Sequence, residues 1–395
     1  MTLSQDFFLA HLAQTSPFPF LLEIDRADGS YIYDKKGKAY LDMIAGVAVN
    51  NIGHRHPKVI EALKTQLEKH LHVMVYGEFI QDAQQALVRQ LLQVLPPALD
   101  GVYVVNSGTE AIEAALKLAK RTTGRTELVS FKGSYHGSTH GAMSVSANEE
   151  KKIAFRPLLP DVRFLPFDQK ESLSQITTRT AGVIIETIQG DAGVRRPSIE
   201  FMQALRKRCS EVGALLILDE IQCGMGRTGR IFAFEHFNVV PDILTLGKGL
   251  GGGMPIGALI SSQQKLKLFT HDPMLGHITT FGGHPMGCAA AAATIDVLRT
   301  QIDWTELEAN CALFEQQISG HKEVVAHRRV GAMFAFDLNS ASQVAQVVEY
   351  CLQHGLITFW FLSHPYSFRL SPPLNLSKTD WDLASQIIIS ALDSL

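Results

Sequence analysis

Short apolar runs alternate with stretches of helical periodicity through the middle of the chain. The runs cover residues 102–105, 128–131, 183–185, 215–218, 243–246 and 256–260, and the helical stretches include 110–121 and 199–212. A short run without polar interruption is typical of a strand that is buried on both faces. The pattern therefore predicts an α/β fold, in which helices cover a mostly parallel sheet.

A different pattern precedes this middle part. Two short strands are expected at 31–34 and 39–42, where a glycine turn joins them into a hairpin. Helical spacing of apolar residues starts at Pro57, and it starts again over 81–95, where Pro96 and a second proline stop the helix. The hairpin is expected to join the C-terminal part of the chain.

The last hundred residues also differ from the middle part. After a helix that opens near Pro285, the expected elements are a long helix from Trp304, a strand over 332–338, a helix over 343–354, two short strands and a final helix after Ser377. This succession predicts a separate α+β unit. We expect an N-terminal segment of residues 1–50 that joins the small domain, a large domain of residues 51–300 and a small domain of residues 301–395.

Composition and charge narrow the possible functions. The 395 residues are 46% apolar and 19% charged with a net charge of −3, which is an ordinary globular balance and gives no electrostatic footprint for nucleic acid or an anionic membrane. No apolar run approaches the roughly 20 residues that cross a bilayer. The first 20 residues have no basic leader, and the five cysteines form no CxxC pair. We therefore expect a cytoplasmic protein with a small-molecule substrate.

The segment 106–110 has the features of a phosphate-binding turn. It follows a predicted strand and opens a predicted helix, and Ser107 and Glu110 have the spacing of a capping box. The free N–H groups at such a helix start attract anions, and Gly108 allows close approach. A well-capped helix without any ligand is the simpler alternative.

Lys248 lies in the glycine-rich stretch 247–253, directly after the predicted strand 243–246. Ligands bind at the carboxyl ends of strands in α/β sheets, and flanking glycines leave space around an amine there. Desolvation would free its lone pair for attack on a carbonyl carbon, whereas the alternative is a solvated lysine in a flexible turn. The same stretch matches a dinucleotide fingerprint only weakly, because no helix follows its third glycine.

Asp219 ends the predicted strand 215–218, 29 residues before Lys248. A buried aspartate beside a protonated ring nitrogen keeps that nitrogen cationic, as an electron-sink cofactor requires. A loop salt bridge or a helix cap is the alternative. We expect no metal site, because the paired histidines of residues 54–56 and 70–72 have no third ligand at a metal-site spacing.

Seven segments in order along the chain carry a family resemblance. They are 51–57, 106–113, 135–137, 186–190, 218–229, 247–249 and 279–285. Together they strongly resemble the class III (subgroup II) aminotransferases, pyridoxal-phosphate enzymes of fold type I that include ornithine, acetylornithine and 4-aminobutyrate aminotransferases. The resemblance covers nearly the whole chain. It implies a large domain with a mostly parallel seven-stranded sheet and a smaller α+β domain.

The resemblance also implies roles around pyridoxal 5′-phosphate. Lys248 would be the Schiff-base lysine and proton carrier, and Asp219 would pair with the pyridinium nitrogen. At the phosphate, the expected contacts are Ser107, Gly108 and Thr109. Around the ring they are Tyr135 on its face, His136 at its edge, Gln222 at the phenolic oxygen, and Glu186 and Ile221 nearby. Thr280 would reach the phosphate of the neighbouring subunit, with Thr279 beside it. A homodimer with shared active sites is therefore implied.

On the substrate side, Arg369 matches the family arginine that binds the substrate α-carboxylate, and a guanidinium suits a carboxylate. Asp191 lies where ornithine-type members carry a glutamate that pairs with this arginine as a gate. Ser138 replaces an arginine that binds a second carboxylate in many relatives, and Val47 replaces a tyrosine of ornithine-specific members.

The missing arginine bears on the substrate. The far carboxylate of 2-oxoglutarate would need another cation, such as Arg55 or Arg163. We expect a transaminase that moves an amino group from an amino acid or ω-amine to a 2-oxoacid, 2-oxoglutarate or pyruvate. The alternatives are a pyridoxal-phosphate mutase or decarboxylase on the same fold and, in a different class, a catalytically silent protein that has kept the fold.

Overall fold

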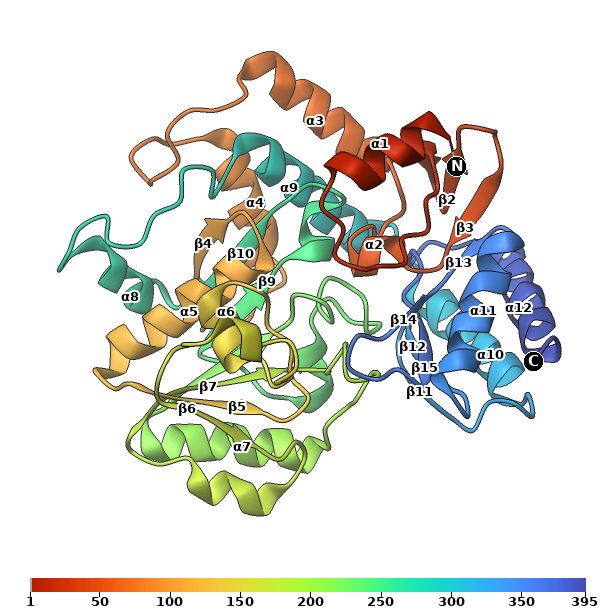
Figure 1. Ribbon diagram of the computed structural model, residues 1–395. Coiled ribbons are helices and arrows are strands. Elements are labelled where there is room, and N and C mark those ends of the chain that lie inside the picture. The colour runs from red at the N-terminus through yellow and green to blue at the C-terminus, as the bar shows by residue number, and fades with distance from the viewer. Residues whose placement is uncertain (1) are drawn as a thin grey trace.

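A seven-stranded sheet forms the centre of the computed structural model, which describes residues 2–395 (Figure 1). Its strands lie in the order β4 (Gly101–Val105), β10 (Gly257–Ser261), β9 (Ile243–Leu246), β8 (Leu215–Asp219), β7 (Thr180–Glu186), β5 (Glu127–Phe131) and β6 (Val162–Leu165). Only β10 runs antiparallel to its neighbours. The expected α/β class with a mostly parallel seven-stranded sheet is confirmed.

Helices on both faces explain why the strands are apolar throughout. Ile184 and Ile217 belong to a core that includes the buried side of α5 (Gly108–Thr123), whereas Ile185 and Leu218 belong to a second core with α7 (Ile199–Val212). Successive residues of a strand point to opposite faces, so both sets must be apolar. The six apolar runs of the sequence are all strands of this sheet.

The N-terminal hairpin and the C-terminal tail lie together on one side of the molecule, as the red and blue ribbons of Figure 1 show. The hairpin of β2 (Tyr31–Asp34) and β3 (Ala39–Asp42) is confirmed, with β1 (Ile24–Asp28) beside β2 and β13 (Leu356–Ile357) parallel to β3. The tail adds an antiparallel sheet of β11 (Ala326–Val330), β12 (Met333–Asp337), β15 (Ser367–Leu370) and β14 (Phe359–Trp360), with helices α10 (Trp304–Ser319), α11 (Ala341–Gln353) and α12 (Lys378–Asp393). The domain limits at residues 50 and 300 stay a prediction.

The remaining helices cover the edges of the large sheet and its loops. Helices α3 (Pro57–Lys69) and α4 (Asp82–Leu92) pack against α9 (Pro285–Thr300), and shorter helices are α1 (Leu3–His11), α2 (Ala45–Ala48), α6 (His140–Val145) and α8 (Gln263–Leu266). Short 3₁₀ turns are η1 (Ile153–Phe155), η2 (Lys170–Gln175), η3 (Ala233–Phe237), η4 (Lys248–Gly251) and η5 (Lys267–Thr270). The helix expected over 81–95 ends earlier, at Leu92, because it must stop before the proline pair. Within residues 2–395, every helix is too short or too polar to cross a bilayer.

Arg227 joins distant parts of the chain inside the protein. Its fully buried guanidinium donates to the carbonyl oxygens of Ala332 and Pro372 and to the side-chain oxygen of Asn51. These hydrogen bonds tie the C-terminal part of the chain to the central part. Because they are buried, water does not take over if the guanidinium is lost.

Replacing Arg227 by methionine is expected to lower the free energy of unfolding by about 3–5 kcal/mol, because the variant leaves buried oxygens without a donor. Chemical denaturation measures this loss. Arg230→Met is the matched control, since Arg230 is exposed on the same loop. Equal stability of the two variants would contradict the role of Arg227.

Candidate active site

Four neighbouring strands end at one cavity of about 270 Å³. Lys248 follows β9, Asp219 ends β8, Glu186 ends β7, and Tyr135 lies in the loop after β5. Glu186 and Asp219 are directly opposite each other in the register of β7 and β8. The carboxyl ends of parallel strands meet at the same edge of a sheet, so residues 113 positions apart in the sequence share one site.

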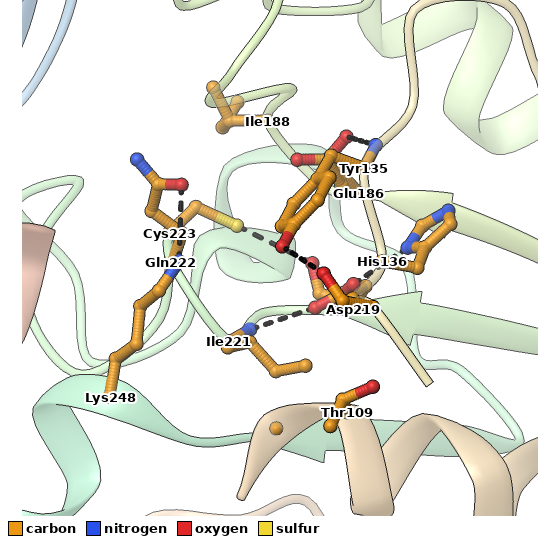
Figure 2. A pocket seen from close by; sticks show the side chains of 13 residues that line it. Thr109, Tyr135, His136, Glu186, Ile188, Asp219, Ile221, Gln222, Cys223 and Lys248 are labelled. Atoms are coloured by element: carbon orange, nitrogen blue, oxygen red, sulfur yellow. Dashed lines mark hydrogen bonds and ion pairs between the residues drawn. The ribbon is translucent and has the colours of Figure 1, made fainter. Parts of the chain in front are cut away.

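Most residues expected to bind the cofactor line this cavity (Figure 2). The expected cofactor residues in the lining are Gly108, Thr109, Tyr135, His136, Glu186, Asp219, Ile221, Gln222 and Lys248, and Ser138, expected on the substrate side, also lines the cavity; the lining residues not singled out are Gly137, Ile188 and Cys223. Gly137, Ile188 and Cys223 all lie within segments that carried the resemblance. Cys223 has no chemical signal in the sequence, and its burial raises the pKa of the thiol well above its ordinary value, which keeps the thiol neutral.

Asp219 is held in one orientation by two contacts, shown in Figure 2. One carboxylate oxygen lies 2.7 Å from Nδ1 of His136, and the other accepts the backbone N–H of Ile221 at 3.0 Å. Both side chains are buried, and Nε2 of His136 has no hydrogen-bond partner among the described residues. Asp219 is thus a fixed buried carboxylate at the bottom of the cavity.

Glu186 is a second buried carboxyl group, but its electrostatics differ. Its two oxygens accept the backbone N–H groups of Tyr135 at 3.0 Å and Gly190 at 3.2 Å. Burial raises the pKa of the Glu186 carboxyl well above its ordinary value, and the neighbouring Asp219 carboxylate raises this pKa further. Glu186 therefore holds a proton more readily than an ordinary glutamate does.

Lys248 starts η4 with a φ of +42°, directly after β9. Its Nζ donates to the side-chain oxygen of Gln222 at 3.3 Å. Burial lowers the pKa of the Lys248 amine below its ordinary value of 10.5, and the positive charge of Arg369 lowers this pKa further. Both effects increase the neutral, nucleophilic fraction of the amine.

The start of α5 forms one wall of the cavity. Ser107 caps the helix by accepting the N–H of Glu110 at 3.4 Å, so Ser107 supports the helix start without lining the cavity itself. A Cβ added to Gly108 would lie 2.7 Å from the side chain of Ile221, which leaves room only for glycine. The first N–H groups of a helix have no partner within it, so this end can bind an anion.

The donor set fits pyridoxal phosphate. A helix start with the hydroxyl of Thr109 suits a phosphate, the fixed carboxylate of Asp219 suits a protonated ring nitrogen, and the amine of Lys248 suits an aldehyde carbon. The ring of Tyr135 supplies a flat aromatic surface, and the side chain of Ile221 adds apolar surface to the lining. Each part of the cofactor would meet a group of matching chemistry.

Arg369, on β15, lies outside the cavity lining but near it. The residue is 6% exposed, its guanidinium carbon lies 5.5 Å from the ring centre of Phe361, and its Nε has no partner. Among residues 2–395, no carboxylate lies within 4.0 Å of the guanidinium. A buried guanidinium without a carboxylate is costly, which suits a residue that receives the carboxylate of a substrate.

Asp191 has other partners than Arg369. Its oxygens accept the N–H of Leu362 at 3.0 Å and the hydroxyl of Ser363 at 2.7 Å, and Nζ of Lys151 lies 3.5 Å away. The loop after β7 is thereby tied to the segment between β14 and β15. In this conformation the described chain contains no gate ion pair between Asp191 and Arg369.

Neither cation suggested for a far carboxylate lies at the cavity. Arg163 pairs with Glu127, the first residue of β5, and therefore lies at the end of the sheet opposite to the site. Arg55 is exposed and lies 3.4 Å from Asp28. The suggestion was wrong for both residues of this chain. Arg163 lies near the start of its strand, at the end of the sheet away from the site, and Arg55 lies in an exposed turn outside the strands.

Three other expected residues lie outside the cavity of this chain. Val47, with a φ of +65°, lies in α2, which packs against η4. Thr279 and Thr280 lie in the loop before α9, where the Thr279 hydroxyl accepts the N–H of Gly282 at 2.8 Å and Thr280 is exposed.

Comparisons with known proteins agree with this geometry. A family profile described as "Aminotransferase class-III" matches residues 13–392. The acetylornithine aminotransferase of Archaeoglobus fulgidus is 38% identical over 93% of this chain and 94% of its own. The LysW-aminoadipate semialdehyde/glutamate semialdehyde transaminase of Sulfolobus acidocaldarius is 38% identical over 85% of this chain and 86% of its own.

A solved structure has the same fold. The ornithine aminotransferase of Toxoplasma gondii ME49 superposes with a TM-score of 0.91 at 28% identity, over the whole of this chain and 96% of that chain. A second structure of the Toxoplasma gondii enzyme is described with partial occupancy of pyridoxal phosphate at its active site.

Proposed function

Since the chain belongs to the class III aminotransferase family and is a pyridoxal-phosphate-dependent transaminase, we propose that it transfers the ω-amino group of an amino acid to 2-oxoglutarate or pyruvate. The related transaminases favour this reaction over that of a mutase or a decarboxylase. One observation carries the proposal: Lys248, Asp219 and the start of α5 meet at a single cavity. The relatives named for acetylornithine and semialdehydes support an ω-amine donor.

Lys248 acts as nucleophile and proton carrier. Its partly neutral amine would hold the cofactor at its aldehyde carbon, and once a donor amine has displaced it, the freed Nζ would carry a proton from the donor carbon to that carbon, and in the opposite direction in the second half-reaction. When bound, pyridoxal phosphate supplies the electron sink for the electrons left on that carbon. Gln222, 3.3 Å from Nζ, orients the amine.

The acids and the arginine hold the reacting groups. Asp219, fixed by His136, keeps a proton on the ring nitrogen, while the neighbouring Glu186 avoids a second negative charge by holding its own proton. Arg369 binds the carboxylate of the amino acid or oxoacid through its buried guanidinium. The ring of Tyr135 would stack on the face of the cofactor ring and orient it.

The proposal is tested by the absorbance of the purified protein with pyridoxal phosphate. A band at about 400–430 nm is expected, and a donor that transfers its amine should shift it to about 330 nm. N-Acetylornithine, ornithine, 4-aminobutyrate and a diamine form the first panel. A band that no donor shifts, or amine loss without amino transfer to an added oxoacid, would contradict the proposal.

The capture of cofactor by the cofactor-free protein should depend on pH. The rate is expected to rise with pH and to level off below pH 10.5, because the pKa of Lys248 is lowered and only the neutral amine attacks. Stopped-flow absorbance measures it. Arg369→Met removes a positive charge that lowers this pKa, so its profile should move to higher pH. A rate that is still rising above pH 10.5, as for an ordinary lysine, would contradict the lowered pKa of Lys248.

We propose a homodimer with shared active sites. Exposed apolar residues gather on the two segments 71–80 and 274–281, which meet where the rings of His72 and Phe281 lie 5.1 Å apart. Ile80 is 87% exposed and Met274 is 78% exposed. An apolar patch of this kind next to Thr279 supports a second copy as its partner.

The molar mass in solution is therefore expected to be twice the 43.5 kDa of the chain. Analytical ultracentrifugation measures it. Combining Ile80→Glu with Met274→Glu should give a monomer, because charges would have to be buried at the interface. Val325→Glu, at an exposed apolar residue elsewhere, is the control. A dimer that survives the double substitution would place the interface on another surface.

The cytoplasm is the compartment that we propose for the protein. All five cysteines are buried free thiols in the described chain, which suits a reducing environment. Cell fractionation with an antibody against the protein tests this location.

A further inference from the structure

Lys151 is a cation at the rim of the active site to which no role has been assigned. It lies between α6 and η1, with Nζ 5.7 Å from the ring centre of Tyr135, a residue of the cavity lining. Its side chain is 37% exposed, so the amine can meet a ligand that enters from solvent. The cavity thus has a positive charge on the side of the Tyr135 ring.

The amine of Lys151 is only weakly held by the protein. Among residues 2–395, Asp191 is the one carboxylate within 4.0 Å, and it lies 3.5 Å away. Asp191 is itself satisfied by shorter contacts, at 3.0 Å to the N–H of Leu362 and 2.7 Å to the hydroxyl of Ser363. Lys151 could therefore exchange this contact for a ligand carboxylate while Asp191 keeps two hydrogen-bond donors.

Asp191 stands between two cations of different kinds. It opposes the lowering of the Arg369 pKa by burial, so the two charges are near each other, and it also contacts Lys151. Arg369 is buried and has no ion-pair partner within the described chain, whereas Lys151 lies at the rim. This arrangement offers one cation to each end of a ligand with two carboxylates, and neither Arg55 nor Arg163 competes for that place.

We propose that Lys151 is a specificity-determining residue that binds the far carboxylate of a dicarboxylic 2-oxoacid such as 2-oxoglutarate, while Arg369 binds the carboxylate beside the keto group. The inference rests on the proposed transaminase function and names its acceptor class. Arg and Lys suit these places, because the buried site favours a fixed guanidinium and the rim favours a flexible amine on a long stem. A monocarboxylate such as pyruvate would use Arg369 alone.

Ligand binding without turnover tests the proposal. Calorimetry on the cofactor-loaded enzyme compares glutarate, a five-carbon dicarboxylate without a keto group, with butyrate. Lys151→Met should raise the Kd of glutarate about tenfold and leave that of butyrate within about twofold, as expected for one lost charge-assisted contact. Lys151→Arg should retain most of the glutarate affinity. Lys207→Met, an exposed lysine of α7, is the matched control for loss of a charge.

Steady-state kinetics should show the same selectivity. In Lys151→Met the KM for 2-oxoglutarate should rise about tenfold, with kcat and the KM for pyruvate almost unchanged. Equal losses for mono- and dicarboxylates would reduce Lys151 to a structural residue, and unchanged glutarate affinity would overturn the proposal. If the unmodified enzyme transfers no amine to any oxoacid, the proposed function fails instead, and that outcome is recognised without any variant.

Discussion

Replacing Lys248 by alanine is expected to lower the turnover number by about 10⁴-fold or more. The substitution removes both the amine that binds the aldehyde carbon and the group that carries the proton, and proton transfer alone contributes about 10²–10⁴-fold. Gly108, Thr109 and Asp219 remain in place, so the variant should still bind pyridoxal phosphate without a covalent bond. Single-turnover absorbance with the best donor measures the loss.

Lys267→Ala, an exposed lysine of η5, provides the control and should retain full activity. Borohydride reduction followed by peptide mapping gives a second readout, because the label should appear at Lys248 in the unmodified protein and nowhere in the alanine variant. A label on another lysine, or an alanine variant within about tenfold of full activity, would refute the assignment.

The large sheet could be predicted because most of its strands are visible in the sequence as short apolar runs. β7, β8 and β9 are covered on both faces, so their residues form unbroken apolar runs. The hairpin of β2 and β3 was equally clear from its turn. These elements satisfy local rules that do not depend on distant parts of the chain.

Two elements were missed for different reasons. Helix α1 has no buried residue, and its capping box of Thr2 and Gln5 was not recognised. β6 is an edge strand of four residues that includes Arg163, and it depends on a distant segment, because its Val162 pairs with Leu128 of β5. Propensity and pattern say little about short elements whose stability comes from a neighbouring strand.

The residues of the site also fall into those that the sequence could place and those that it could not. Residues that follow strands, such as Asp219 and Lys248, could be placed together because parallel strands end at a common edge. Lys151 could not be found in this way, since its position over Tyr135 depends on the path of the loop after α6. Arg163 looked equivalent as a cation, yet it lies at the other end of the sheet.

Two acids at equal positions on adjacent strands allow a sharp test of the electrostatics. Glu186 and Asp219 are neighbours in the register of β7 and β8, and burial together with the Asp219 carboxylate raises the pKa of Glu186 well above its ordinary value. A buried pair of carboxyl groups does not carry two charges at close range without large cost. The negative charge of the site is therefore concentrated on Asp219, next to where the ring nitrogen would lie.

Replacing Asp219 by asparagine should accordingly lower kcat by about 10²–10³-fold, the typical cost of losing a preorganised charge at a reacting group. The amide has the same shape and can keep a contact with His136, so the fold should be retained. What is lost is the charge that holds the proton on the ring nitrogen. Rapid-scanning absorbance of the donor half-reaction measures the change in rate, and thermal unfolding checks stability.

Glu186→Gln is the matched comparison and should lower kcat by less than about tenfold, because it replaces a group that already tends to be neutral. The asparagine variant has a second consequence, since removing the Asp219 charge removes one cause of the raised Glu186 pKa. Glu186 should then ionise at lower pH, and the residual activity should recover partly as pH rises, because a new carboxylate stands near the site. Equal losses in both variants would mean that the two acids share the charge, contrary to the assignment.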